Sequence, residues 1–473
     1  MRNYSGIQMS ARSVKSLGCV MLIIGWTHVG RGFSLLGPFD TWQTTDMTYQ
    51  VGPGADIGGP QNLGEEFRFS APTVFYAFES SFLDYFGSNG VAEVQKAIKT
   101  LNDIPAYSRL SQQLTEYPLQ SQRINYQAQA LFLFDLKSFA LHALLEQMGL
   151  AEPERYTWTL RARFIPPGAV CPRVNYAVIH RNFDPVTFEP TAYVNGTLYS
   201  YQIVETCLAP YEADAIEFQV DPLAFTYTSV AGLNMLIGGF FTGLTRDDMG
   251  GLRYMYRKSN YNTEALPNDA TVGSGTAIVL GNTDSPWTPV FGTNNLPTNV
   301  VPPTATSSNI ALRAGVDKVT FVRADFDSVL GSFFVPFTNS YSSSTLVNGR
   351  SRSERVFRGV VHPDIVFAAA DLGVFNPSAV PVSWARTFPP AYQRSATTGL
   401  NGPGTLPLGV AAPTFLIFSK IGTVHVNQGP FFIDEASAGV AFTWASFDGS
   451  TNTPVLYPSG RSIMDLEAEI LRP

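Results

Sequence analysis

Helical periodicity in this chain is concentrated in three stretches, and most of the remaining sequence consists of short runs in which apolar and polar residues alternate. Apolar side chains recur at helical spacing within residues 88–104, 135–149 and 245–257. The alternating runs are bounded by turn residues such as Gly, Pro and Asn, a pattern typical of strands. A chain with few long helices and many short strands predicts an α+β fold.

The ends of the first two predicted helices carry capping signals. An aromatic strand over Pro72–Phe82 precedes the first helix, which Ser88 or Asn89 caps. Asp135 is the predicted N-cap of the second helix, and Gly149 is its predicted C-cap. The second helix therefore has defined limits at both ends.

The third helix begins with a capping box. Thr245 is the predicted N-cap, and Asp248 follows it three residues later, so that each side chain bonds to the backbone N–H of the other residue. The paired glycines Gly250 and Gly251 lower the helix propensity of this segment. We expect them at a place where another element packs closely against the helix.

The strand-rich segments predict two domains. Residues 33–258 form the first domain and contain a β-rich insertion at about 156–228. Within this insertion, the Asn-Gly pair of Val194–Thr197 favours the type I′ turn of a hairpin. Residues 259–309 are rich in Pro, Asn and Thr, which predicts a linker. Residues 310–473 contain short alternating runs, which predict an all-β, sandwich-like second domain.

Residues 1–32 have the organisation of a secretory signal peptide. Basic residues precede an apolar core, Leu17–Trp26, which is shorter than a bilayer-spanning helix. The glycines of Gly30–Gly32 suit a cleavage site, so Phe33 is the predicted mature start. A retained N-terminal anchor is the alternative. We expect an exported protein that is secreted or attached to the cell surface.

The composition restricts the class of partner. The chain has a net charge of −7, only 15% of its residues are charged, and no basic run follows the N-terminal segment. Nucleic acid is not an expected partner, because phosphate binding needs a concentrated positive surface. No later apolar stretch is long enough to span a membrane. We expect a protein or glycan partner of unknown identity.

Two cysteines remain if Cys19 is removed with the signal peptide. An even number of cysteines in an exported chain predicts one disulfide, between Cys171 and Cys207. Such a bridge would stabilise the β-rich insertion by restricting its unfolded state. The alternative is two separate buried thiols.

Three elements, taken in order, resemble the catalytic domain of metzincin metallopeptidases, in particular the matrixin-like branch. They are the strand and helix at 72–104, the helix that contains His142, and the segment Leu244–Tyr256. The last segment matches a closing-helix pattern of that family at Leu244, Thr245, Asp247, Asp248, Gly251, Leu252, Met255 and Tyr256. Met235 lies a short distance upstream, where a Met-turn would be. The resemblance covers about residues 70–258 and implies a twisted sheet with long helices.

The resemblance implies a zinc site that is degenerate in this sequence. In the family motif HExxHxxGxxH three histidines bind zinc; here His142 matches the first, while Glu146 and Glu152 stand at the second and third. Gly149 matches the turn glycine. Ala143 stands where the family has the glutamate that acts as general base. Because an alanine side chain accepts no proton, activation of a zinc-bound water is not expected.

Three functions remain open. The favoured one is an exported, non-catalytic metzincin-like protein that acts as a binding or structural surface component without a cofactor. The second is a zinc-dependent peptidase with a rearranged site, in which His142, Glu146 and Glu152 bind the metal. The third is a purely structural β-rich extracellular protein. If no metal binds, these three residues are expected to be polar residues on a solvated edge of the helix.

Overall fold

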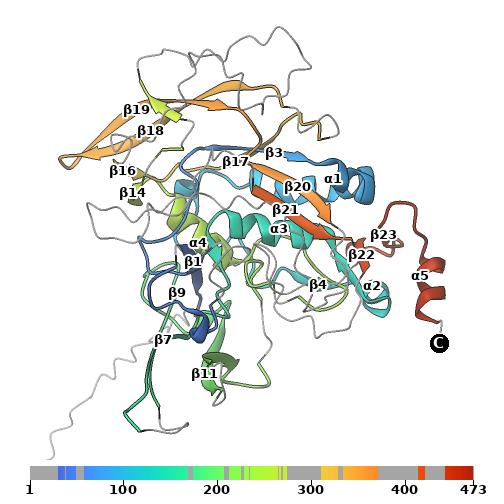
Figure 1. Cartoon of the computed structure of the whole chain (residues 1–473), viewed down its shortest axis with the longest axis horizontal. Helices are drawn as coiled ribbons and strands as arrows, with labels where there is room; N and C mark the ends of the chain where they lie inside the picture. Colours follow the sequence, from blue (N-terminus) through green and yellow to red (C-terminus); the bar gives the residue numbers. More distant parts are fainter. Residues whose placement is uncertain are drawn as a thin grey trace, which may run out of the picture.

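The computed structural model describes residues 30–37, 39–49, 58–168, 174–206, 212–224, 228–233, 235–264, 266–267, 270–273, 311–328, 334–370, 414–420 and 443–471. Its helices are α1 (Ser80–Asn102), α2 (Tyr126–Ala130), α3 (Leu136–Gln147), α4 (Arg246–Tyr256) and α5 (Ile463–Ile470). Several separate sheets surround the helices (Figure 1), which confirms the predicted α+β class. Within these residues, no helix has the length and apolar character needed to cross a membrane.

A four-stranded parallel sheet lies at the centre of the fold. Its strands, in order, are β17 (Thr320–Arg323), β3 (Thr73–Phe78), β20 (Ile365–Ala370) and β21 (Thr414–Ser419), and each neighbouring pair is parallel. α1 contacts strands of this sheet and also packs against α3 (Figure 1). The sheet, α1 and α3 therefore form successive layers of one core.

Strands from both halves of the chain build this sheet. β3 comes from the N-terminal half, whereas β17 and β20, which flank it, both follow residue 310. The main hydrophobic core likewise runs from Phe33 to Tyr457. The two-domain layout with a separate sandwich-like domain at 310–473 is therefore not confirmed. The physical reason is that the buried β3 can complete its backbone hydrogen bonding only with strands from the C-terminal half.

The boundary between the first predicted strand and the helix that follows it differs from the expected one. β3 ends at Phe78, and residues 80–86 are already helical, although Pro72–Phe82 reads as one strand. Gly87 has the non-helical angles φ 60° and ψ −162° and separates this first segment from the predicted helix that follows. The aromatic residues at the end of the predicted strand thus form an additional helical segment. Its side chains Phe82 and Phe86 pack into the main core.

The other sheets lie around this centre. The five-stranded one has the order β14 (Tyr261–Glu264), β16 (Ala311–Ala314), β18 (Phe337–Val347), β19 (Arg350–Val360) and β15 (Ala270–Val272). A second joins β23 (Val455–Leu456), β22 (Thr443–Ser446) and β5 (Leu133–Asp135), and a third joins β2 (Gly59–Pro60), β1 (Phe33–Gly37) and β6 (Leu150–Ala151), with β9 (Asn182–Phe183) also on β1. β13 (Gly239–Phe241) pairs with β4 (Gln122–Ile124).

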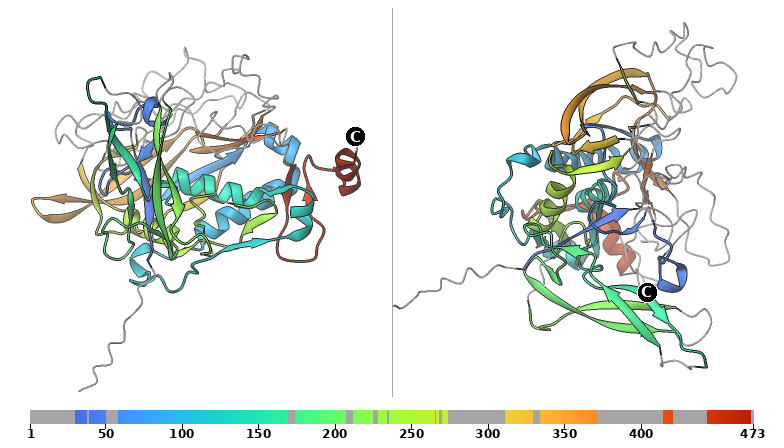
Figure 2. Two further views of the ribbon diagram at one scale, coloured as in Figure 1. Left: turned by 90° about the horizontal axis from the view of Figure 1, so that it is seen from below. Right: turned by 90° about the vertical axis from the view of Figure 1, so that its left-hand side faces the viewer.

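The predicted β-rich insertion forms a lobe that projects from the body (Figures 1 and 2). One layer is the hairpin of β7 (Thr159–Phe164) and β8 (Asn175–Ile179), and the other is the sheet β10 (Tyr193–Val194), β11 (Thr197–Glu205) and β12 (Ala213–Gln219). Asn195 and Gly196 have positive φ angles of 42° and 93°, and Val194 pairs with Thr197. The predicted Asn-Gly hairpin is therefore confirmed.

Residues immediately before the predicted mature start are built into the fold. The Arg31 guanidinium donates to the backbone oxygen and to Oε1 of Gln113, at 2.6 and 2.7 Å. The Gly32 N–H donates to Asp247, and β1 begins at Phe33 with its side chain buried. Cleavage directly after Gly32 would remove the contacts of Arg31, so the described fold begins upstream of the expected cleavage site.

Candidate functional site

The helix that carries the candidate zinc ligands is a core helix. Asp135 caps α3, as predicted, by accepting hydrogen bonds from the backbone N–H and the hydroxyl of Ser138. Gly149 follows the C-cap residue and has a φ of 101°, which glycine tolerates best. Ten of the twelve residues of α3 are buried, on all sides of the helix. A helix that is buried all round lies inside the molecule rather than at a solvent-filled cleft.

His142 lies in this core and does not lie on a solvated edge. Its side chain is only 4% exposed, and Nδ1 lies 3.0 Å from the backbone oxygen of Val230. Since a carbonyl oxygen only accepts, Nδ1 carries the proton in this contact. Burial lowers the pKa of His142 to about 4, against a smaller opposing effect of its backbone hydrogen bonds. The imidazole is therefore neutral and fixed by a structural hydrogen bond.

Two buried carboxylates hold the loop that presents Val230 to this histidine. Glu154 accepts from the backbone N–H of Ser229 at 2.8 Å and from the hydroxyl of Thr228 at 3.1 Å. Asp248 accepts from the backbone N–H groups of Val230 and Ala231 at 3.2 and 2.9 Å. The position of the Val230 oxygen is thus set by side chains from outside the loop.

Glu154, Asp247 and Asp248 form a buried acidic cluster. Burial raises the pKa of Glu154 to about 7 and raises the pKa values of both aspartates, and the proximity of Asp248 adds to the effect on Glu154. Asp247 accepts from the backbone N–H groups of Gly32 and Asn195. Asp247 and Asp248 therefore tie the N-terminal segment, the lobe and the 228–233 loop to α4.

The two candidate carboxylate ligands, Glu146 and Glu152, are not grouped with His142 as potential metal ligands in the described part of the chain. Glu146 lies half-buried in the last turn of α3, and Glu152 follows β6. Among the described residues there is no group of three or more His, Cys, Asp or Glu side chains placed to hold a metal ion. Zinc binding by His142, Glu146 and Glu152 is therefore unsupported.

The other two positions of the implied site are also core positions. Ala143 is buried in α3. Met235, the candidate Met-turn residue, is partly buried and packs against the main hydrophobic core. Both side chains therefore have packing roles that need no metal.

The predicted features of the closing helix are confirmed. Thr245 and Asp248 form the capping box at the start of α4, with the backbone N–H of Thr245 2.8 Å from Asp248 Oδ2. A Cβ added at Gly250 would lie 2.4 Å from Cβ of Pro185, and one added at Gly251 would lie 2.4 Å from Leu150 Cδ2. The glycine pair thus allows other segments to pack closely on α4, as expected.

Several residues of this region gave no usable signal in the sequence. Glu154 makes the buried contacts, although the metzincin-like spacing points to Glu152, two residues earlier. Val230 contributes only a backbone oxygen, which no side-chain pattern reveals. Cys171 and Cys207 lie outside the described residues, so the disulfide stays a prediction.

Comparison with known proteins identified no relative of this chain. The chain matches no protein-family model, no curated protein and no solved structure. The resemblance to metzincins therefore remains a prediction from the residues of this chain.

Proposed function

We propose that this protein is an exported, non-catalytic component with a binding or structural role, in which a metzincin-like frame has become part of the hydrophobic core. The observation that carries the proposal is the burial of His142. The imidazole that would be the first zinc ligand is only 4% exposed and lies on a helix that is buried on all sides. A hydrolytic metal site needs an open coordination position that substrate and water can reach.

The surroundings of His142 support the same proposal. The residue beside it, Ala143, is buried in the core, so the general-base position faces packed side chains instead of a substrate cleft. The loop that contacts His142 is held by Glu154 and Asp248, whose oxygens accept hydrogen bonds from that loop. Both carboxylates therefore have a structural role, which is to hold this loop in place.

Peptidase assays on the full chain test the proposal. We expect no cleavage of unstructured peptides, with or without added zinc, for the wild type. We also expect none for Ala143→Glu, which restores the general base of the family motif. The glutamate should lower the unfolding temperature, because a carboxylate is placed in the core. Ala143→Gln, which is equal in size and uncharged, separates crowding from charge. Chelator-sensitive cleavage by the wild type would refute the proposal.

A further inference from the structure

The hairpin of β18 and β19 projects from the body and ends in an exposed segment (Figure 1). All residues from 347 to 353, which include the turn and the start of β19, are exposed. β15 pairs with β19 only at Val356–Arg358, closer to the body. Since successive side chains of a strand point to opposite faces, a ligand can reach both faces of the end of this hairpin.

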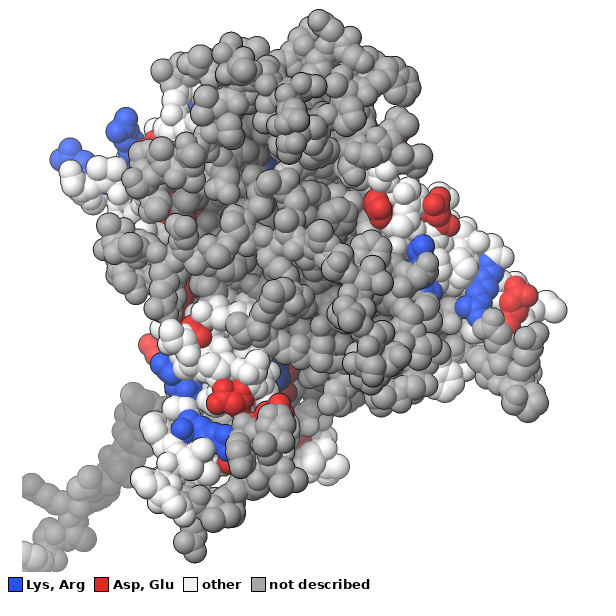
Figure 3. Space-filling view, in the orientation of Figure 1, with Lys and Arg blue, Asp and Glu red and all other residues white. Residues whose placement is uncertain are grey.

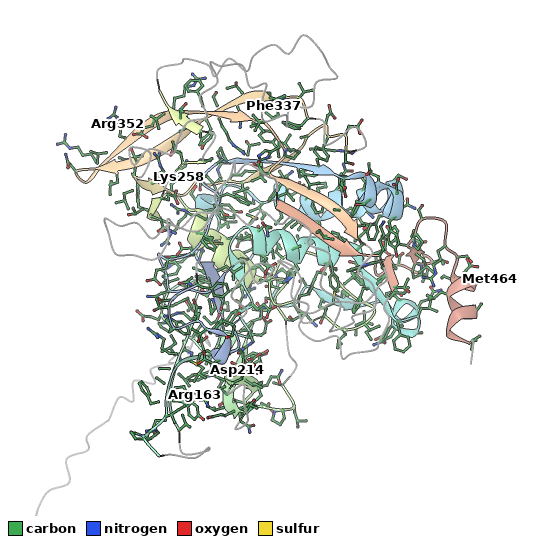
Figure 4. All side chains as sticks on the ribbon, viewed as in Figure 1. Arg163, Asp214, Lys258, Phe337, Arg352 and Met464 are labelled. Atoms are coloured by element: carbon green, nitrogen blue, oxygen red, sulfur yellow. The ribbon has the colours of Figure 1, made fainter. Side chains whose placement is uncertain are left out.

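Exposed arginines are concentrated at this end of the hairpin. They are Arg350, Arg352 and Arg355. The first two lie on one face of β19, and Arg355 lies on the other. Among the described residues, none of the three is ion-paired with a carboxylate. Figure 3 shows basic side chains at the projecting end, and Figure 4 shows Arg352 on it. The hairpin thus presents local positive charge, although the chain has a net charge of −7.

The other charged side chains of the hairpin are paired within the fold. Glu354 Oε2 lies 3.3 Å from Nη1 of Arg313, whose side chain is only 2% exposed. Arg358 forms a buried ion pair with Asp364. Glu354 is the only acidic residue between 337 and 360. Because it pairs with Arg313, it does not neutralise the exposed arginines.

Hydroxyl groups lie beside these arginines. On the face of Arg355, Ser344 and Ser353 are directly opposite each other in the hairpin. Arg355 Nη2 donates to the hydroxyl of Ser340 at 3.3 Å. A hydroxyl both donates and accepts hydrogen bonds, and a guanidinium binds both oxygens of a carboxylate or a similar oxyanion. This combination suits a ligand that carries anionic groups and many hydroxyl groups.

Other anionic partners fit the hairpin less well. Val347, which is 48% exposed, is the one large apolar side chain among its exposed residues, whereas protein interfaces have an apolar and aromatic core. Single-stranded nucleic acid stacks on aromatic side chains, and residues 347–355 contain none. A flat lipid surface meets only one face of such an arm, but the arginines lie on both. A linear polymer can contact both faces.

We propose that the β18–β19 hairpin binds a linear anionic glycan through Arg350, Arg352 and Arg355. Carboxylate or sulfate groups of the polymer accept hydrogen bonds from the guanidinium groups, and its hydroxyl groups bond to the neighbouring serines. The polymer passes over the end of the hairpin and so reaches the arginines on both faces. The inference rests on the proposed binding role and names the class of ligand.

Isothermal titration calorimetry of the full chain with defined polymers tests the inference. Polygalacturonate supplies carboxylates, chondroitin sulfate supplies sulfates as well, and dextran is the uncharged control. At low ionic strength, where charge–charge attraction is least screened, we expect micromolar binding of at least one of the two anionic polymers. We expect no binding of dextran.

Two matched variants locate the binding site. Arg352→Gln should raise the dissociation constant at least about tenfold, because a charge-assisted hydrogen bond is lost. Arg123→Gln is the control, since Arg123 is also an exposed arginine and lies on β4, away from the hairpin (Figure 1). It removes the same charge from the chain and should leave the affinity unchanged. Equal losses of affinity in the two variants would show attraction to the whole molecule and overturn the inference.

Amide hydrogen exchange of the wild type gives a second readout that depends on no variant. We expect residues 346–353 to gain protection when the polymer binds. Binding of neither anionic polymer, or equal binding of dextran, overturns the inference. Tighter binding of phosphatidylserine vesicles or of an oligothymidylate also overturns it, in favour of a lipid or nucleic-acid ligand. Peptidase activity in a chain that binds the polymers would instead remove the proposed function and leave glycan binding standing.

Discussion

At the scale of single residues, burial decides the chemistry of His142. The motif spacing brings an imidazole, a glycine and two glutamates into a metzincin-like register, but a sequence motif does not specify which side of a helix meets solvent. In the structure, most neighbours of His142 on α3 are apolar and buried, and its Nδ1 lies 3.0 Å from the Val230 oxygen. The same residue types then have a structural role.

His142 should therefore make the protein less stable in acid. Its pKa is lowered from about 6.5 in the unfolded chain to about 4 in the folded one, so below pH 6.5 the unfolded state binds more protons. Between pH 7 and pH 5 this residue should reduce the free energy of unfolding by about 2 kcal/mol. Urea unfolding at both pH values measures this loss, and His142→Gln should abolish it.

Glu154 changes the pH dependence of stability in the opposite direction to His142. The effect of His142 is therefore measured as the difference between wild type and His142→Gln. The pKa of Glu154 is raised to about 7 in the folded protein, so its contribution to stability is present below about pH 4.5 and is lost as the pH rises through about 7. Glu154 is present in both proteins and cancels in the difference. An equal pH dependence in the two proteins would show that His142 is not buried in a neutral form.

At the scale of secondary-structure elements, local signals predicted most of what local interactions determine. The caps Asp135 and Thr245, the Asn195 turn and the glycine pair of α4 all follow from bonding within a few residues and were predicted correctly. A second Asn-Gly turn at Asn348, with φ 49°, carries the same signal and joins β18 to β19. The boundary between β3 and α1 was missed because aromatic side chains fit a strand and a core-facing helix equally well.

Pro185 packs closely against Gly250 of α4, so a substitution that favours the helix is expected to destabilise the protein. Gly250→Ala should raise helix propensity by about 1 kcal/mol, yet it should destabilise the protein by about 1–3 kcal/mol, because the new methyl group meets Pro185. Chemical unfolding measures the net effect. Gly243→Ala is the control, since a Cβ there meets no atom within 4 Å. Stabilisation by Gly250→Ala would mean that the packing on α4 is looser than described.

At the scale of the whole molecule, pairing between distant strands determines the architecture. β3 and β17 are separated by more than 200 residues and pair in parallel, and β20 completes the other side of β3. No local pattern encodes such a partner, because an alternating run reads the same in a sandwich and at the centre of a mixed fold. The polar stretch at 259–309 resembles a linker and suggested two domains for that reason.

The shared sheet predicts that the two halves of the chain do not fold separately. Residues 30–273 alone should lack a cooperative unfolding transition, because β3 loses both neighbours and the core loses residues such as Phe367 and Trp444. Circular dichroism during thermal unfolding measures this for the fragment and the full chain. A fragment that unfolds cooperatively near the temperature of the full chain would favour the two-domain layout.

His142 is buried in the core, and we propose that it binds no catalytic metal. Elemental analysis of the purified full chain after incubation with zinc and removal of the excess tests it most directly. We predict no stoichiometric zinc, and the same result for wild type and His142→Gln. About one zinc per wild-type chain, lost in His142→Gln, would contradict it, because the imidazole would then be a ligand.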